Sequence, residues 1–296
     1  MKRVSFCFVL LCMIIHSYSQ STMQLLQNVQ TELAKQKGFF AIAFKDLQTN
    51  ETLLWNEHEL FHAASTMKTP VMIEVYKQVA AGKLTLTDAV LVKNEFKSIV
   101  DGSPYSLNPA DDSQQELYKM VGSKIPLSEL VYQMIIMSSN LATNLIMEMV
   151  DGKKVTQTMR NLGTKNMMVL RGVEDSKAFA QNLNNITTAY DLMVVYEQLA
   201  KGKVVSQKAS DEMINTLFNQ THNTLIPALL PKNIRVAHKT GTITGVHHDS
   251  GIVFLADGRK YVLVILSKNL ENDIEATNSM AKVSEMIYQH IINKTN

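Results

Sequence analysis

Cysteine is nearly absent from this 296-residue sequence, which contains only Cys7 and Cys12. Both lie where two basic residues precede an apolar run over 4–15 and small residues follow. That pattern is typical of a secretory signal, residues 1–19, which is removed before Gln20. A lipid anchor on Cys12 is disfavoured because the residue before it is large. We therefore expect an exported protein, periplasmic or secreted, without a disulfide, a cysteine nucleophile or a thiolate metal site.

An excess of one charge is also missing. The formal net charge of +2 falls to zero once Lys2 and Arg3 are removed, which argues against a nucleic-acid partner. Beyond the leader, no segment has about twenty uncharged apolar residues, so we expect no stable membrane insertion. The 12 glycines and 6 prolines are too few for collagen-like repeats or long low-complexity linkers. With 46% hydrophobic residues, the chain 20–296 should form a single domain, and we expect a monomer.

Hydrophobic periodicity predicts helices at both ends of this domain, strands next to them and a helical block between. The closing helix should turn Ile274, Ala281, Met286, Ile287 and Ile291 inward. The fold class is therefore α+β: an antiparallel sheet flanked by terminal helices, with an inserted all-helical lobe. The α/β lobe should comprise 20–60 and 220–296, and the helical lobe 61–219. Expected helices are 22–37, 66–81, 127–150, 189–200, 206–218 and 273–293; expected strands are 39–46, 52–55, 234–238, 251–256 and 260–267; expected long loops are 95–124 and 171–188.

Ser65 and Lys68 form an S-x-x-K pair at the expected start of a helix. A serine hydroxyl is a weak nucleophile that needs a base. Residues at i and i+3 share a helix face, so Lys68 can reach Ser65. The helix N-terminus also offers backbone N–H groups to an oxyanion. The pair alone is a weak signal, because a second S-x-x-K at Ser279–Lys282 is best interpreted as an ordinary surface turn.

Two further segments follow in a specific order. Ser138-Ser139-Asn140 lies in the apolar helical run, and Lys239-Thr240-Gly241 lies on a predicted strand. A second hydroxyl can pass a proton to a leaving group, an amide can bind a substrate carbonyl, and a lysine flanked by threonines can hold a carboxylate. Because Gly241 has no side chain, a substrate backbone could lie against the strand there.

This order resembles the signature of the penicillin-recognising serine enzymes, which comprise penicillin-binding proteins and class A β-lactamases. Segments 61–68 and 138–145 resemble the nucleophile segment and the S-D-N helix of class A. The resemblance covers nearly the whole chain after the leader. It implies a β-lactamase/transpeptidase-like fold with the active site in the cleft between the lobes. We expect neither a cofactor nor a metal.

The resemblance implies a catalytic role for three of these residues. Ser65 would be the acylated nucleophile, and Lys68 a base or proton relay. Ser138 would donate the proton to the departing nitrogen. The backbone N–H groups of Ser65 and Thr242 would form the oxyanion hole.

The resemblance also implies a set of substrate-binding residues. Asn140 would bind the substrate's side-chain amide, and Lys239, Thr240 and Thr242 would hold its carboxylate, beside the backbone of the K-T-G glycine. Tyr105, on the long polar loop, would either wall the site or anchor the loop.

The segment that would hold the deacylating water departs from the family pattern. Residues 171–174, Arg-Gly-Val-Glu, resemble the start of the family's Ω-loop, and Thr187-Thr188 resembles its end. The family's glutamate is followed closely by Leu-Asn, whereas Glu174 is followed by Asp-Ser-Lys. Glu174 is thus a candidate base, with a salt-bridged loop residue as the alternative. Asp175 and Asn184 are lesser candidates, and the departure concerns water attack on the acyl-enzyme, not acylation.

Three smaller departures accompany it. Ser139 replaces the aspartate of S-D-N, a mainly structural position in the family. Ser250 stands where the family often places an arginine, which leaves His247 and His248 as local cations. Pro70 is expected in the second turn of the nucleophile helix, where it removes one backbone hydrogen bond and would kink the helix.

His58-Glu59-Leu60-Phe61-His62 matches H-E-x-x-H, a zinc-protease pattern on a helix. It lies between a strand and a helix start, and no third ligand follows at a suitable spacing, so the alternative is a polar connector that places Phe61 in the core. The run His247-His248-Asp249 could indicate a metal or a turn between strands.

These observations predict an exported serine hydrolase that opens β-lactam rings through a Ser65 acyl-enzyme. The first alternative is a penicillin-binding or D,D-peptidase-like enzyme that acylates but deacylates slowly. The second is a receptor for a β-lactam or a peptidoglycan fragment that uses the same covalent capture as a signal. Serine-dependent glutaminases share the S-x-x-K architecture, but the export signal and K-T-G disfavour them.

Overall fold

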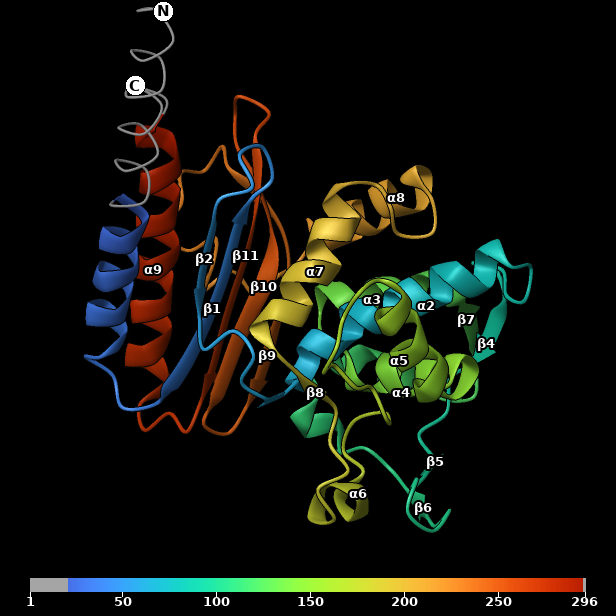
Figure 1. Ribbon diagram of the computed structural model, residues 1–296. Coiled ribbons are helices and arrows are strands. Elements are labelled where there is room, and N and C mark those ends of the chain that lie inside the picture. Colours follow the sequence, from blue (N-terminus) through green and yellow to red (C-terminus); the bar gives the residue numbers. More distant parts are fainter. Residues whose placement is uncertain (1–20, 295–296) are drawn as a thin grey trace, which may run out of the picture.

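We describe residues 21–294 of a computed structural model, so the expected leader and its cleavage site lie outside the described residues. Five strands form one antiparallel sheet in the order β2-β1-β11-β10-β9 (Figure 1). Strand β1 pairs with β11 along its whole length, which joins the first strand of the chain to the last. The expected shared sheet is therefore confirmed. The strands are β1 (Phe39–Asp46), β2 (Thr52–Trp55), β9 (Arg235–Ile243), β10 (Val246–Phe254) and β11 (Lys260–Lys268).

Both faces of the sheet are covered, and the alternation along its strands shows how. In β1, Phe40, Ile42 and Phe44 face the helix of residues 21–33 and α9 (Asp273–Asn293), whereas Ala41 and Ala43 face the helical part. Small side chains on the second face let α7 (Ala189–Ala200) pack close to the sheet (Figure 1). The strand order places β9 at the edge of the sheet nearest the remaining helices.

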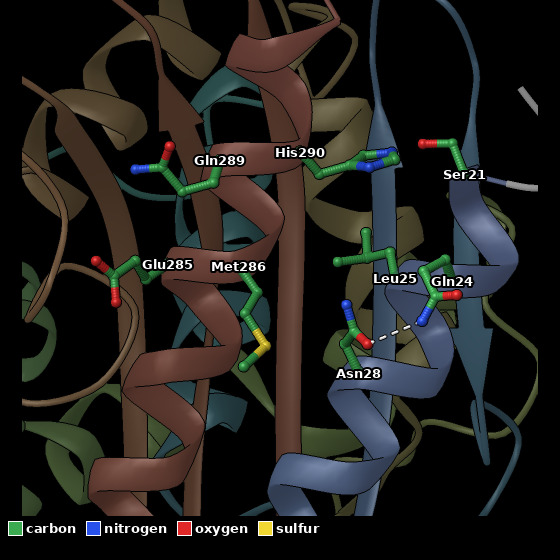
Figure 2. Close-up of a pocket in the computed structure, with 8 residues that line it drawn as sticks. All are labelled: Ser21, Gln24, Leu25, Asn28, Glu285, Met286, Gln289 and His290. Carbon is green, nitrogen blue, oxygen red and sulfur yellow. Dashed lines mark hydrogen bonds between the residues drawn. The ribbon is translucent and has the colours of Figure 1, made fainter.

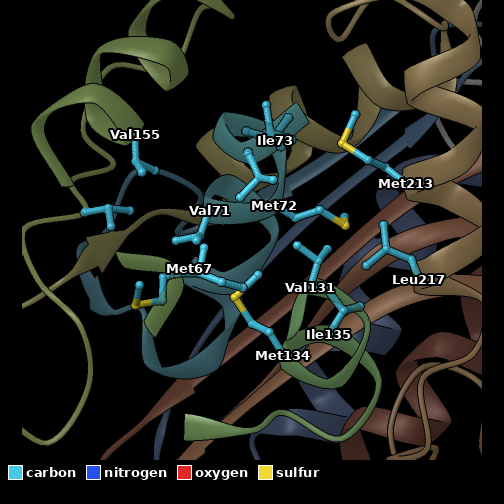
Figure 3. Packing of buried hydrophobic residues seen from close by; sticks show 14 of the residues in the cluster. Met67, Val71, Met72, Ile73, Val131, Met134, Ile135, Val155, Met213 and Leu217 are labelled. Atoms are coloured by element: carbon cyan, nitrogen blue, oxygen red, sulfur yellow. The ribbon is translucent and has the colours of Figure 1, made fainter. Parts of the chain in front are cut away.

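The helical part surrounds α2 (Lys68–Ala80), which follows the short 3-10 helix η1 (Ala64–Met67). Every residue from Thr66 to Val75 is buried, as expected for a helix enclosed on all sides. Methionines from η1, α2, α3 and α8 meet branched aliphatic side chains there (Figure 3). Unbranched thioethers fill irregular gaps between helices, so this core holds the nucleophile segment from behind. The other helices are α3 (Leu127–Ile136), α4 (Asn140–Val150), α5 (Gly152–Asn161), α6 (Ser176–Ala180) and α8 (Gln207–Leu217), with η2 (Pro109–Asp111) and η3 (Gln115–Met120).

The expected single helix over 127–150 is wrong. The chain leaves α3 at Met137 and enters α4 at Asn140, and Ser138 between them adopts a left-handed φ of 58°. Ser139 caps α4, since its hydroxyl accepts the backbone N–H of Ala142 at 3.2 Å. Apolar periodicity runs across the break because both helices face the same core, so the pattern alone did not reveal it.

Several smaller expectations also need correction. His247, His248 and Asp249 lie within β10, which begins five residues earlier than expected because the turn falls at Gly245, with φ of 68°. Ile274, in the first turn of α9, is 76% exposed and does not face inward as expected. Pro70 lies in the first turn of α2, where a missing amide removes no hydrogen bond of that helix.

The loops expected over 95–124 and 171–188 contain short elements. Besides η2, η3 and α6, these include one two-stranded ladder inside the 95–124 loop, while two further ladders pair strands at the ends of the loops with residues outside them. Strand β3 pairs with β8 at the base of the 171–188 loop. None of the helices within residues 21–294 is long and apolar enough to cross a membrane. The ladders are β3 (Phe61–His62) with β8 (Ile186–Thr187), β4 (Ala89–Leu91) with β7 (Lys124–Pro126), and β5 (Phe96–Lys97) with β6 (Pro104–Tyr105).

Candidate active site

The nucleophile segment is pressed against the edge strand of the sheet. Ser65 lies on η1, directly after Ala64, whose φ of 44° turns the chain into the helix. A Cβ added to Gly241 on β9 would lie 3.0 Å from the backbone nitrogens of both Ser65 and Thr66. The missing side chain therefore makes room for η1 itself. This close approach fixes the N–H groups of η1 beside the edge of β9.

Lys68 is buried at the centre of the site and makes three hydrogen bonds. Its Nζ donates to the Ser138 carbonyl at 2.6 Å, to Ser138 Oγ at 3.2 Å and to Asn140 Oδ1 at 3.0 Å. Burial lowers the pKa of Lys68 from 10.5 to about 7, although the charges of Asp112 and Glu174 act in the opposite direction. An amine with this pKa is partly neutral near pH 7 and can accept a proton. No hydrogen bond within residues 21–294 joins Lys68 Nζ to Ser65, so the direct contact that the spacing predicted is not formed.

Ser138 lies between two buried amines. Its Oγ accepts hydrogen bonds from Lys68 and, at 3.0 Å, from Lys239 Nζ. Lys239 also donates to the Thr240 carbonyl at 3.0 Å. Burial and the nearby charge of Lys68 lower the pKa of Lys239 well below its usual value. The left-handed backbone of Ser138 directs both its carbonyl and its hydroxyl to Lys68, which explains why the helix breaks here.

Asn140 connects this lysine to the candidate base. Its Oδ1 accepts from Lys68 while its Nδ2 donates to Glu174 Oε1 at 2.7 Å. Partial desolvation and the neighbouring carboxylates of Asp111 and Asp112 raise the pKa of Glu174 against the effect of that hydrogen bond. Glu174 is therefore bonded to a site amide, not to a basic side chain as the alternative expected. Its φ of 61° is a strained conformation of the kind that clusters at functional sites.

A clamp from the 95–124 loop and α4 holds the backbone next to Glu174. Asn144 Oδ1 accepts the Val173 N–H at 2.6 Å, and Asn144 Nδ2 donates to the Val173 carbonyl at 3.1 Å. The Tyr105 hydroxyl donates to the same carbonyl at 3.3 Å. Tyr105 thus anchors the loop, the second of the two roles considered, and it does not line the cavity described below.

The two lesser base candidates are engaged elsewhere. The buried Asp175 carboxylate accepts from Ser98 Oγ and from the Ile99 N–H, each at 2.9 Å. Asn184 Oδ1 accepts from Arg171 Nη2 at 3.2 Å. Neither side chain reaches the site, which leaves Glu174 as the base candidate that the fold brings to Asn140.

A cavity of about 210 Å³ is lined by Ser65. It brings together Ser65, Ser138, Asn140, Thr240 and Thr242, all predicted from sequence. The lining residues that the sequence did not single out are Asp111, Ser113, His222, Thr224 and Leu225.

Of the two histidines considered as local cations, His247 lines the cavity and His248 does not. Burial lowers the pKa of His248 to about 4, and its Nε2 donates to the His62 carbonyl at 2.9 Å. His248 is therefore a neutral structural residue. His247 has a pKa lowered by burial, and its Nδ1 lies 3.0 Å from Thr277 Oγ1.

The zinc pattern does not have the geometry it requires. Residues 58–62 are not helical; the His58 ring packs on Tyr190, and His62 Nδ1 accepts the Ala64 N–H at 3.0 Å. Phe61 is buried in the core, as the connector interpretation expected. Residues 21–294 contain no cluster of three or more His, Cys, Asp or Glu side chains arranged to hold a metal ion.

A larger groove of about 540 Å³ lies elsewhere, between α9 and the helix of residues 21–33 (Figure 2). Gln24 and Asn28 hydrogen-bond to each other along its wall, and Met286 and Leu25 supply apolar surface. These helices cover the face of the sheet opposite the helical part, so the groove is separate from the Ser65 cavity (Figure 1).

Sequence reasoning missed three side chains that organise the site: Asp112, Asn144 and Asn185. Asn185 Oδ1 accepts the N–H groups of Leu170 and Arg171, and its Nδ2 donates to the Arg171 carbonyl. Asp112 and Asn185 are single polar residues in long loops and Asn144 is a single polar residue within α4, so none carries a spacing signal, because their partners are distant in the sequence.

The fold, the buried lysine near a serine at a helix start, and the second serine between two amines are the features of a serine hydrolase. Comparison with known proteins agrees. The chain belongs to the Beta-lactamase enzyme family, whose model matches residues 24–291. The family resemblance inferred from the motifs is thereby confirmed.

Individual relatives are distant but cover almost the whole chain. Extended-spectrum beta-lactamase PER-1 of Pseudomonas aeruginosa is 24% identical over 91% of this chain and 88% of its own. The structure of PBP-A superposes with a TM-score of 0.79 at 26% identity, covering 91% of this chain and 96% of that one; a mutant of PBP-A was solved as an acyl-enzyme complex with penicillin-G. A beta-lactamase from Sphaerobacter thermophilus gives a TM-score of 0.76 at 25% identity, covering 91% and 96%.

Proposed function

We propose that this protein is an exported monomeric enzyme that hydrolyses β-lactams through a Ser65 acyl-enzyme, with Glu174 as the base for deacylation. The observation that carries the proposal is the position of Asn140, which hydrogen-bonds to Lys68 on one side and to Glu174 on the other. One amide thus connects the machinery for acylation to a carboxylate suited to activating water. The proposed site lies between an α/β lobe of 20–60 and 220–296 and a helical lobe of 61–219.

Acylation follows from the groups around Ser65. Lys68, partly neutral at pH 7, takes the serine proton directly or through Ser138 as the oxygen attacks the lactam carbonyl. The backbone N–H groups of Ser65 and Thr242 receive the developing oxyanion. Ser138, which is bonded to both lysines, passes a proton to the departing nitrogen. Lys239, Thr240 and Thr242 hold the substrate carboxylate at the edge of β9.

Deacylation needs a water molecule and a base. A Glu174 carboxylate takes a proton from water, which then attacks the ester carbonyl and releases Ser65. The Asn140 hydrogen bond holds that carboxylate beside a residue that lines the cavity, and the clamp on Val173 fixes the neighbouring backbone. These contacts support Glu174 in this role despite the unusual residues that follow it.

A second candidate function is a slowly deacylating penicillin-binding enzyme. Two observations favour it. The first is that Asp175 and Asn184 are both engaged outside the site, so neither side chain joins Glu174 as a second partner for the water. PBP-A, among the similar structures, has a mutant captured as a penicillin-G acyl-enzyme. In this alternative, acylation of Ser65 proceeds as above and the ester persists.

Intact mass spectrometry distinguishes these functions. The protein from Gln20 onwards is mixed with benzylpenicillin, and the adduct mass and ring opening are followed in the same sample. Many equivalents of opened product with little adduct support the hydrolase, and Glu174→Gln should then accumulate adduct with deacylation slowed about 100-fold or more. A persistent single adduct on the wild type supports slow deacylation. Ser65→Ala is the matched control and must form neither adduct nor product.

Export is tested separately from catalysis. Expression of the full chain in a Gram-negative host, followed by fractionation and N-terminal sequencing, should place a protein beginning at Gln20 in the periplasm. Recovery of the unprocessed chain in the cytoplasm would contradict the export proposal without affecting the catalytic one.

A further inference from the structure

The buried carboxylate of Asp112 lies directly behind the Ser138–Asn140 segment. It follows η2 and is 3% exposed. Its Oδ2 accepts the backbone N–H groups of Asn140 and Leu141, each at 2.9 Å, and the Tyr118 hydroxyl at 3.0 Å. Two amides at the start of α4 and one phenol thus converge on a single carboxylate oxygen. A carboxylate in this position satisfies orphan donors of the helix and interacts favourably with its dipole.

The same carboxylate contacts the motif position at which this chain differs from its family. Ser139 stands where S-D-N has its aspartate, and its hydroxyl donates to Asp112 Oδ2 over a long 3.4 Å. Ser139 also caps α4 through Ala142. A negative charge therefore lies beside Ser139 although the motif itself lacks an aspartate, because Asp112, 27 positions earlier in the sequence, supplies it.

We infer that Asp112 is a positioning residue that replaces the motif's aspartate: it fixes the start of α4 so that Ser138 and Asn140 face Lys68, and it supplies the local negative charge. The inference rests on the proposed function. Asp112 itself touches no reacting atom, since it acts through the backbone of Asn140 and through its charge.

Electrostatics provides a signature for this role. The Asp112 charge acts to raise the pKa of Lys68 against burial, and it contributes to the raised pKa of Glu174. Two other charged groups belong to this network: Asp111 also raises the pKa of Glu174, and the charge of Lys68 in turn lowers the pKa of Lys239. Tyr118 remains a donor, because burial and the Asp112 charge raise its pKa.

A charge-relocation experiment tests the inference. The variants are Asp112→Asn, Ser139→Asp and the double variant Asp112→Ser/Ser139→Asp, which moves the carboxylate into the motif. Asp211→Asn, an exposed site on α8, is the matched control. Acylation by benzylpenicillin is measured by stopped flow, deacylation by adduct decay, both from pH 5 to 9, and thermal midpoints report folding.

Asp112→Asn should slow acylation about tenfold, because the two backbone amides at the start of α4 would then bond to a neutral oxygen, which holds Ser138 and Asn140 less firmly. Ser139→Asp should also slow acylation, since it places a second carboxylate against Asp112. The double variant should recover to within about threefold of the wild type, as expected for two coupled positions. The acidic limb of each pH–rate profile reports the pKa of its base, Lys68 for acylation and Glu174 for deacylation. Because the Asp112 charge raises both pKa values, both limbs should move to lower pH in Asp112→Asn and return to the wild-type position in the double variant.

A loss of folding alone would lower the active fraction without moving these limbs. Failure of the double variant to recover, or unchanged limbs in a folded Asp112→Asn, would overturn the inference while the wild type still acylates. A wild type that forms no adduct would overturn the proposed function and, with it, this inference.

Discussion

Gly241→Ala tests the packing of the edge strand against the nucleophile. The added Cβ would lie 3.0 Å from the nitrogens of Ser65 and Thr66 and 3.1 Å from Thr66 Cγ2, whereas an ordinary contact begins at 3.4 Å. Two of the three neighbours are backbone atoms that cannot rotate away, so β9 and η1 must separate by about 0.4 Å, in keeping with the tight packing of protein interiors. Overpacking of this kind costs about 1–3 kcal/mol of unfolding free energy.

The separation should also affect chemistry, because the N–H groups of Ser65 and Thr242, which we propose as the oxyanion hole, lie on the two elements that move apart. A displacement of about 0.4 Å should reduce the acylation rate about tenfold, and deacylation, which uses the same hole, by a similar factor. Stopped-flow acylation and urea unfolding measure the two effects separately.

Gly258→Ala is the matched control, since its φ of 90° strains alanine while its Cβ would meet nothing within 4 Å. It should lose about 1 kcal/mol of stability through backbone strain and keep the wild-type acylation rate. A Gly241→Ala protein with wild-type stability and wild-type acylation would refute the close approach of β9 to η1. Loss of stability without loss of rate would refute its link to the oxyanion hole.

Three further perturbations give distinct outcomes. Lys68→Met should slow acylation about 1,000-fold, as for loss of a general base; in the wild type the acylation rate should rise with pH through about 7, which stopped flow measures. Burial lowers the pKa of Lys68 from 10.5 to about 7, so between these two pH values the unfolded chain binds one more proton than the folded protein. The free energy of unfolding of the wild type should therefore rise with pH over this range, and Lys68→Met should remove that rise in urea titrations. Asp249→Asn should cost about 2–3 kcal/mol in thermal unfolding, because its buried carboxylate bonds to His238 Nδ1 at 2.9 Å; an unchanged midpoint would contradict this. Met72→Ala should cost about 2–5 kcal/mol through the cavity left in the core, with acylation per folded molecule unchanged within about twofold.

The bounds of several elements could be predicted from local pattern. The bounds of β1, β2, α7 and α9 agree with the expected ranges, because each combines a clear period with a turn or cap signal at its ends. The end of β9 and the start of β10 could not, since both strands continue through polar residues whose partners lie across the sheet. A buried polar strand carries no alternation that marks its limits.

The candidate site was predictable only as a set of residue types in order. Ser65, Lys68, Ser138, Asn140 and the K-T-G segment were found because the family signature fixes their order along the chain. The sequence did not indicate that Ser138, rather than Ser65, would accept the Lys68 hydrogen bond. That outcome depends on the left-handed backbone of Ser138 between α3 and α4, which a periodic pattern of apolar residues does not reveal.

The loop containing Glu174 shows the same limit. Sequence indicated a departure from the family after this residue but left its role open. Tertiary structure brings Glu174 to Asn140, turns Asp175 towards Ser98 and binds Asn184 to Arg171. Each of these choices depends on a hydrogen-bond partner from another segment of the chain.

The sequence by itself determined the family and the shared antiparallel sheet and predicted Ser65 as the nucleophile, because periodicity and the order of motifs can be seen along the chain without knowing distances in space. Tertiary structure alone decided which carboxylate lies next to Asn140 and which serine Lys68 binds. It alone also placed the Asp112 carboxylate beside the Ser138–Asn140 segment, which has no aspartate of its own. The physical reason is that hydrogen bonding and burial depend on distances in space, and residues far apart in the sequence acquire those distances only when the helices pack against the sheet.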